Sequence, residues 1–269
     1  PIWQEAAKKH FDLVVCACEM DPAKQAAQIE DFVAQHVDAI LAAPCDSDAI
    51  GPNLEGPERA GIPVFTVDIA AHGGKVVSHI GSDNVEGGRL AARTLAALIG
   101  DRGKIIIIDH PEVSSVQDRT RGFDDEIKKH PNITIVGRPS ASGQRARAMA
   151  VTEDLLQAQP DLKGIFGIND DSALGALSVL ESARRKDVTI VGFDATPEAQ
   201  AAIRRGSALK ADVIQYPSKI GVAAIDTIAA HLAGETVPPL VSVPVGVVTP
   251  ESLAAESGST PAPQAPGHS

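Results

Sequence analysis

The chain has 269 residues, 43% of them hydrophobic, so it is long enough to bury one large core or two of ordinary size. Its formal net charge is −11 and no long run of Lys and Arg of the nucleic-acid-binding type occurs, which argues against binding to the phosphate backbone of nucleic acids. The longest apolar stretches, such as Lys104–Asp109, have the length of strands and are far too short to cross a membrane. These features favour a neutral small molecule or another protein as the partner.

Apolar runs rich in Val and Ile alternate along the chain with segments of helical period. The runs expected to form strands are Asp12–Cys18, Val37–Pro44, Ile62–Asp68, Lys104–Asp109, Ile133–Gly137, Gly164–Asn169, Val188–Asp194, Leu209–Ile214 and Val241–Val248. Helices are expected over Asp21–His36, Ala49–Ala60, Asn84–Ile99, Ser115–His130, Gln144–Gln159, Asp171–Arg184, Pro197–Arg205 and Ser218–Leu232. Strands that are apolar throughout and separated by helices are typical of parallel sheets covered on both faces. The sequence therefore predicts an α/β protein with two doubly wound parallel sheets.

The end of the chain differs in composition. Glu251–Ser269 is rich in Ser, Pro, Ala and Gly and poor in large apolar residues. Such a segment buries too little apolar surface to offset the entropy lost on ordering, so we expect it to be disordered.

The three cysteines are Cys16, Cys18 and Cys45. Cys16 and Cys18 are two residues apart and would share one face of the expected strand. A pair spaced in this way, with no second pair and no nearby His, makes a poor zinc site. We expect free thiols that are buried or half-buried, and a disulfide involving Cys45 stays open as the alternative.

Polar residues recur where the expected strands end, and ligands of open parallel sheets bind outside the carboxyl ends of strands. They are Asp46, Asp48, Asp68, Asp109, His110, Asn169, Asp170, Asp171, Asp194 and Gln215. A carboxylate accepts hydrogen bonds from two hydroxyl groups, and an amide both donates and accepts, so the set suits the hydroxyl groups of a sugar. Asp46 and Asp170 stand just before helices, where capping is the commoner role. Asp68 and Asp194, taken singly, fit turns, but their recurrence after two strands indicates a shared site.

Other chemistry has little support in the sequence. The eight histidines form neither an HxH nor an HExxH pattern, so no metal site is predicted. Ser82–Leu90 contains two glycines but no phosphate-binding order, and Ser114 and Ser115 lack the GxSxG context of a serine hydrolase. A glycosidase built on Asp68 and Asp194 remains the one enzymatic alternative, and it depends on their separation in space. We predict no catalytic residue and no cofactor.

Six segments, in order and at matching spacing, resemble the type I periplasmic sugar-binding proteins, most closely the ribose-binding members of that family. They are "DPAKQAAQIEDFVAQHVDAILAAPCDSDAI", "GIPVFTVDIAAHGGKVVSHIGSDNVEGG", "DRTRGF", "GIFGINDDSALGAL", "IVGFDATPEA" and "IQYPSKIG". The resemblance extends to about Thr249. It implies two similar α/β domains, joined by a three-crossover hinge, that close over a sugar and present it to an ABC permease.

The resemblance also implies domain boundaries. The first domain would comprise residues 1–82 and 216–243, and the second residues 83–214 and 244–250. The crossovers would fall near Ser82–Asn84, Gln215 and Pro244, and residues 251–269 would form the disordered tail. By the same comparison the end of the first helix aligns with the start of this chain, so we expect the first strand, with roughly 20 residues of the domain, to precede Pro1.

Five residues match ligand-binding positions of the family. The resemblance implies that Asp68 of the first domain and Asp194 of the second bind sugar hydroxyls, with Arg119, Asn169 and Gln215 completing the network. An arginine fork, two carboxylates and two amides can satisfy several adjacent hydroxyl groups.

Besides the absent first strand with its ligand-facing residues, two positions depart from the ribose-binding pattern. Ile69 stands where an arginine follows the first aspartate, and Gly143 is the best match for an aromatic residue of the second domain. Trp3 would stack on the sugar only if "PIWQ" corresponds to an early aromatic loop of the family. The gap-free alternative makes Trp3 an aromatic residue of a helix, buried in the core.

The sequence thus predicts a solute-binding component of an ABC importer for a pentose, a related sugar or a polyol. It would be a monomer without enzymatic activity, periplasmic or lipid-anchored outside the cytoplasm, with the permease and a membrane sensor as candidate partners and no nucleic acid. The effector domain of a LacI-type repressor, which shares the fold, is the alternative. That class needs a DNA-binding module, which this chain does not contain.

Overall fold

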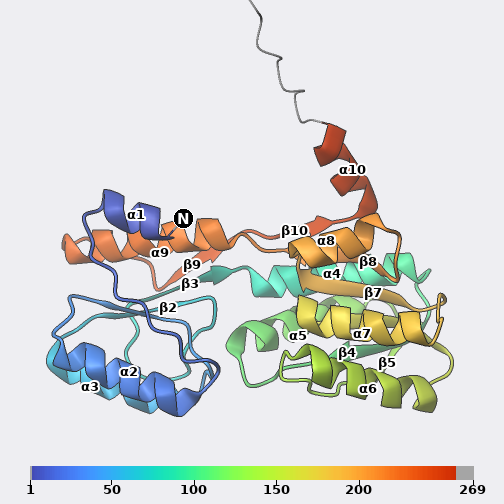
Figure 1. Cartoon of the computed structure of the whole chain (residues 1–269), viewed down its shortest axis with the longest axis horizontal. Helices are drawn as coiled ribbons and strands as arrows, with labels where there is room; N and C mark the ends of the chain where they lie inside the picture. Colours follow the sequence, from blue (N-terminus) through green and yellow to red (C-terminus); the bar gives the residue numbers. More distant parts are fainter. Residues whose placement is uncertain (1, 259–269) are drawn as a thin grey trace, which may run out of the picture.

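The computed structural model describes residues 2–258, which form two sheets, each enclosed by helices (Figure 1). One sheet has four strands in the order β1-β2-β3-β9, and the other has six in the order β10-β8-β7-β6-β4-β5. Every pairing is parallel except that of β10, which runs antiparallel to β8 at the edge. The predicted α/β class with two doubly wound sheets is confirmed.

The four-stranded sheet carries helices on both faces. Its strands are β1 (Ile40–Ala42), β2 (Val64–Val67), β3 (Ser78–Ser82) and β9 (Leu240–Val243). The helices of this lobe are α1 (Ile2–Lys8), α2 (Pro22–Ala34), η1 (Gly51–Leu54), α3 (Glu55–Ala60) and α9 (Pro217–Leu232). Successive strand residues face opposite ways, so Val64 packs with the α2 residue Ile29 while Phe65 packs with Ile220 of α9.

The six-stranded sheet is covered in the same manner. Its strands are β4 (Gly103–Ile108), β5 (Ile133–Gly137), β6 (Leu162–Gly167), β7 (Thr189–Asp194), β8 (Leu209–Ile214) and β10 (Gly246–Val248). Its helices are α4 (Asn84–Leu98), α5 (Ser114–Ile127), α6 (Arg145–Ala158), α7 (Asp170–Ser182), α8 (Pro197–Arg204) and α10 (Pro250–Gly258). Ile105 of β4 packs with the α4–α5 side and Ile106 with the α6–α7 side, which explains why this strand is apolar throughout.

The chain passes between the two sheets three times. It leaves β3 for α4 at Asp83, leaves β8 for α9 at Gln215 and Tyr216, and leaves β9 for β10 at Pro244 and Val245. The predicted single strand Val241–Val248 is therefore two strands in different sheets. The Ser82 hydroxyl donates to Gln215 Oε1 over 2.6 Å and so ties the first crossing to the second.

The predicted first strand, Asp12–Cys18, is wrong, whereas β3 was not expected from the sequence. Asp12–Cys18 pairs with no strand of the described residues, and Val14 and Val15 are 60% and 64% exposed. A run of alternating side chains becomes a strand only where a neighbour supplies hydrogen bonds, and β3 has such neighbours on both sides in β2 and β9.

The cysteines also differ from the expectation. Cys18 and Cys45 are joined as a disulfide, which is the alternative that the sequence left open, and Cys16 is free and exposed.

The expected disorder of the tail is wrong for its first part, which forms α10. Leu253 of this helix is 1% exposed and packs into the core of the six-stranded lobe. Thr249 and Ser252 bond reciprocally at the start of the helix, each backbone N–H donating to the other side-chain hydroxyl. Residues 259–269 lie outside the described residues.

Helices α4 and α5 pack closely because glycines face backbone on both sides. A Cβ at Gly88 of α4 would overlap the carbonyl oxygen of Arg119, and a Cβ at Gly122 of α5 would overlap that of Val85. Each glycine thus lets one helix approach the other, and this contact fixes the position of Arg119.

We predict that Gly88→Ala lowers the free energy of unfolding by about 1–3 kcal/mol, because the added methyl group forces α4 and α5 apart. Gly56→Ala on α3 is the matched control, since a Cβ there would meet nothing within 4 Å. It should be neutral or stabilise by about 0.4–1 kcal/mol. Urea unfolding measures both, and equal losses for the two variants would contradict the close-packing argument.

Candidate functional site

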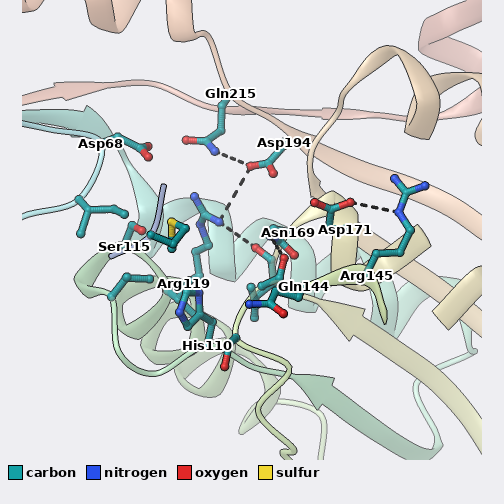
Figure 2. Close-up of a pocket in the computed structure, with 17 residues that line it drawn as sticks. Asp68, His110, Ser115, Arg119, Gln144, Arg145, Asn169, Asp171, Asp194 and Gln215 are labelled. Carbon is teal, nitrogen blue, oxygen red and sulfur yellow. Dashed lines mark hydrogen bonds and ion pairs between the residues drawn. The ribbon is translucent and has the colours of Figure 1, made fainter. Parts of the chain in front are cut away.

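A cleft of about 530 Å³ lies at the carboxyl ends of strands from both sheets (Figure 2). Its lining residues are Met20, Asp68, Ile69, His110, Val113, Ser115, Val116, Arg119, Ser142, Gly143, Gln144, Arg145, Ile168, Asn169, Asp171, Asp194 and Gln215. Of the eight candidate residues from the sequence, all except Trp3 line it. Trp3 lies on α1 and is 56% exposed, so its expected burial in the core is wrong.

Arg119 is the buried cation of the cleft, only 4% exposed. Its Nε donates to Asn84 Oδ1 over 2.9 Å and its Nη1 donates to the carbonyl of Ile168 over 2.8 Å. The guanidinium carbon lies 3.8 Å from the centroid of the Phe193 ring. Burial lowers the pKa of Arg119, and the nearby charge of Asp194, 4.0 Å from Nη1, opposes that shift. The side chain is thereby fixed as a charged, rigid donor.

Asp194 ends β7 and faces this guanidinium. Its Oδ1 accepts a hydrogen bond of 2.6 Å from Gln215 Nε2, and its Oδ2 accepts a longer one of 3.5 Å from the backbone N–H of Asp170. Burial raises the pKa of Asp194 to about 6, and the charge of Asp170 adds to the rise while Arg119 and Gln215 oppose it. This carboxyl group therefore changes charge close to neutral pH.

Asp68 directly follows β2 and approaches the cleft from the other lobe. Its backbone N–H donates to the carbonyl of Ile80 over 2.9 Å, and its φ of 65° lies in the left-handed region. Asp194 also has positive φ, at 116°. Each aspartate therefore has both roles: it takes a turn conformation, and that turn directs its carboxylate into the cleft. Figure 2 shows the guanidinium of Arg119 between them.

Two amides complete this group, and each also has a structural role. Asn169 caps α7, its Oδ1 accepting from the N–H of Ser172 over 2.9 Å, while its Nδ2 donates to the carbonyl of Gly143 over 3.1 Å. Gln215 bonds Asp194 on one side and Ser82 on the other, so it spans the crossing segments. Each amide keeps part of its donor and acceptor capacity for a ligand.

The departures from the ribose-binding pattern shape one wall. Ile69 packs against the core of the six-stranded lobe and offers the cleft an apolar surface. Gly143 has a φ of 66°, and a Cβ there would lie 3.1 Å from Nδ1 of His110 and 3.2 Å from Nδ2 of Asn169. His110 thus occupies the space beside Gly143, and a larger side chain at 143 would be both strained and crowded.

Several lining residues were not expected from the sequence to belong to the site. His110 and Asp171 stood among its strand-end polar residues, but nothing in the pattern raised them above loop chemistry. Met20 and Gln144 lie in loops with no motif. Arg145 pairs at the rim with Asp171 over 3.1 Å and with Glu198 over 2.8 Å, contacts that join residues far apart in the chain.

Asp46 has the capping role expected for it, whereas Asp170 does not. Asp46 Oδ1 accepts from the N–H groups of Asp48 and Ala49, as a cap does. Asp170 is not the cap of α7, because Asn169 takes that position. Asp170 is instead buried, and its Oδ2 accepts from the N–H of Thr196 over 2.6 Å.

Most of the chain, residues 3–236, matches the family model of a periplasmic binding protein domain. The chain belongs to the periplasmic binding protein family. It is 37% identical over 235 residues to the ribose import binding protein of Escherichia coli strain K12, an alignment that covers 87% of this chain and 79% of the relative. The resemblance inferred from the six motifs is confirmed.

Solved structures of similar proteins agree. An ABC transporter solute binding protein from Mycobacterium smegmatis, with bound glycerol, has a TM-score of 0.89 at 35% identity over 96% of this chain and 90% of that one. One from Actinobacillus succinogenes, with bound D-allose, has a TM-score of 0.86 at 30% identity over 94% and 92%. Such names describe binding and import, which favours a binding protein over the glycosidase alternative. No helix within residues 2–258 of this periplasmic binding protein is long and apolar enough to span a membrane.

We predict that the Asp194 carboxyl titrates in the unliganded protein with a midpoint of about 6. Gln215→Leu should raise that midpoint, because it removes a hydrogen bond to the charged form. Carbon-13 NMR of the carboxyl groups measures both. Gln159→Leu, which alters a glutamine bonded to Lys104 on β4, is the control and should leave the midpoint unchanged. A midpoint near the ordinary aspartate value of about 4 would contradict the burial argument.

Proposed function

We propose that this chain is the solute-binding component of an ABC importer and captures a monosaccharide or polyol in the cleft. One observation carries the proposal: hydrogen-bonding side chains from both lobes converge there. Asp68 comes from the four-stranded lobe, Arg119, Asn169 and Asp194 come from the six-stranded lobe, and Gln215 lies between the two.

Recognition would rest on hydroxyl groups. The Asp68 and Asp194 carboxylates accept from ligand hydroxyls, Arg119 donates to ligand oxygens, and the amides of Asn169 and Gln215 do both. Because Asp68 and Asp194 belong to different lobes, a ligand that bonds both gains contacts only when the lobes are together. Ligand binding therefore favours the closed arrangement.

We take residues 1–82 with 216–243 and residues 83–214 with 244–250 as the two bodies that close. Hydrogen bonds between loops of the two lobes are compatible with such closure. Ser114 Oγ accepts from the N–H of Ala70 over 2.8 Å, and Ser47 Oγ accepts from the N–H of Ser114 over 2.9 Å, so loops of the two lobes meet through serines. These small polar contacts can be broken and remade at little cost in free energy.

The relatives and the cleft together favour a small polyhydroxy ligand over a specific sugar. The similar proteins are named for ribose or were solved with D-allose or glycerol. In this chain Ile69 replaces an arginine of the ribose-binding pattern, so a part of the ligand surface faces carbon rather than a donor. We therefore infer a small polyhydroxy ligand, namely a pentose, a related sugar or a polyol, and do not assign ribose in particular.

The remaining assignments follow from this role. The protein would act as a monomer in the periplasm or as a lipid-anchored protein outside the cytoplasm, without a cofactor and without turning over its ligand. Its partners would be the importer permease and, as a second candidate, a membrane sensor that recognises the same closed form.

Calorimetry with a panel of pentoses, hexoses and polyols tests the proposal. We expect saturable binding of at least one, and loss of about a hundredfold or more in affinity for Asp68→Ala, since two charge-assisted hydrogen bonds of about 1.5–3 kcal/mol each are removed. Asp68→Asn, which tolerates the left-handed conformation, separates the lost charge from backbone strain. Asp154→Ala, an exposed position on α6, is the control. Failure of every compound to bind the wild-type protein would overturn the sugar assignment.

A second prediction concerns the apolar wall. Ile69→Arg adds up to five N–H donors to the cleft, so we expect the order of preference among the panel to change, with affinity for ribose rising by tenfold or more (about 1.4 kcal/mol). Ile69→Leu keeps the wall apolar and should preserve the wild-type order. An unchanged order in Ile69→Arg would show that residue 69 does not contact the ligand.

A further inference from the structure

The backbone that carries Asp194 is strained. Asp194 has a φ of 116° and Ala195 a φ of 52°, so two successive residues with side chains lie at positive φ. Each such residue costs about 1–3 kcal/mol and persists only where its surroundings hold it. The turn that aims Asp194 into the cleft therefore needs support from outside itself.

Two buried carboxyl groups supply that support. The N–H of Ala195 donates to Asp212 Oδ1 over 3.0 Å, and the N–H of Thr196 donates to Asp170 Oδ2 over 2.6 Å. The N–H of Asp170 in turn donates to Asp194 Oδ2 over 3.5 Å. Asp212 of β8 and Asp170 of α7 thus hold the two peptide groups that follow Asp194.

The two carboxyl groups are also buried away from water. Asp212 is 0% and Asp170 4% exposed. One oxygen of each, Asp170 Oδ1 and Asp212 Oδ2, has no hydrogen-bond partner among the described residues. A Cβ at residue 192 would overlap Asp212 Oδ2, so Gly192 leaves the room for this carboxyl. A proton shared between the two carboxyl groups would give these oxygens a partner and would leave the pair with one buried negative charge in place of two.

We propose that Asp170 and Asp212 share one proton and act as a positioning pair, which fixes the strained turn after β7 and so sets the Asp194 carboxylate for ligand binding. The part concerning the ligand rests on the function proposed above. The part concerning the turn stands on the hydrogen bonds alone. Asp212 itself does not touch the ligand, because it lies behind the residues that line the cleft.

The charges around the pair favour the shared proton. Burial raises the pKa of Asp212 well above its ordinary value, and the negative charges of Asp170 and Asp194 raise it further. Arg119 of α5 is the cation that faces Asp170 and Asp212, but the Asp194 carboxylate lies nearer to Arg119 than they do. On α8, Glu198 is engaged by Arg145, and β10 places Val248 opposite Asp212. No cation of the described residues forms an ion pair with Asp170 or Asp212.

The sign of the pH dependence follows. An aspartate whose pKa is higher in the folded than in the unfolded state binds more protons when folded. Its contribution to stability is fully present below the unfolded value of about 3.9 and is lost as the pH rises towards the raised folded value. Asp212→Asn replaces the shared O–H with an amide N–H donor and removes the titration.

The test compares Asp212→Asn with Asp212→Leu, and uses Asp154→Asn on α6 as the exposed control. Melting temperature from pH 4 to pH 9.5 is measured without ligand, and calorimetry at pH 7 and pH 9.5 uses the panel sugar that the wild type binds best. We expect the melting temperature of the wild type and of Asp154→Asn to fall more steeply with rising pH than that of Asp212→Asn. Asp212→Leu should lose stability at every pH because both its bonds are gone.

Binding gives the second readout. Asp212→Asn should keep the wild-type dissociation constant within about threefold, and Asp212→Leu should raise it at least about tenfold, the loss of roughly one hydrogen bond to a charged group. Parallel pH profiles for wild type and Asp212→Asn, or wild-type affinity in a folded Asp212→Leu, would overturn the proposal. If the wild type binds no sugar, the proposed function fails, while the ligand-free melting profiles still decide whether the pair shares a proton.

Discussion

A guanidinium group cannot leave water unless its donors and its charge are satisfied, and the arrangement of this protein around Arg119 follows from that requirement. The close approach of α4 and α5, which Gly88 and Gly122 permit, places the side chain under the sheet edge. A carbonyl and an amide then take two of its N–H groups, and Phe193 covers its face. What remains of its charge is directed towards Asp194 and Asp68, which is where hydroxyl groups of a ligand would be bound.

The two carboxylates of the cleft are supported in different ways. Asp194 is held by Gln215, by the N–H of Asp170 and by a turn that buried carboxyl groups support. Asp68 belongs to the other lobe. In the proposed function, a ligand that bonds both would join the two lobes, which is the physical basis of closure in a hinged protein.

The cleft also shows how specificity can change while the fold stays the same. In the proposed function, the charged and amide residues would select a class of ligand through its hydroxyl groups. Ile69 and Gly143 change what surrounds those groups, the first by removing donors and the second by leaving space that His110 fills. Because neither change disturbs the strands, the relatives can share an architecture and bind different polyhydroxy compounds.

The sequence by itself determined the alternation of strands and helices, since a strand buried on both faces must be apolar and a surface helix must have a 3.6-residue period. It also determined which side chains stand at strand ends, so Asp68, Asp194 and Gln215 could be named without coordinates. The tertiary structure alone decided where strands find partners. Asp12–Cys18 has the pattern of a strand and no neighbour, and Val241–Val248 divides between two sheets at Pro244. It also placed Asp170 and Asp212, which are 42 positions apart in the numbering, on two successive peptide groups of one turn. Hydrogen bonding and shared protons depend on distance in space, and periodicity along a chain does not encode that distance.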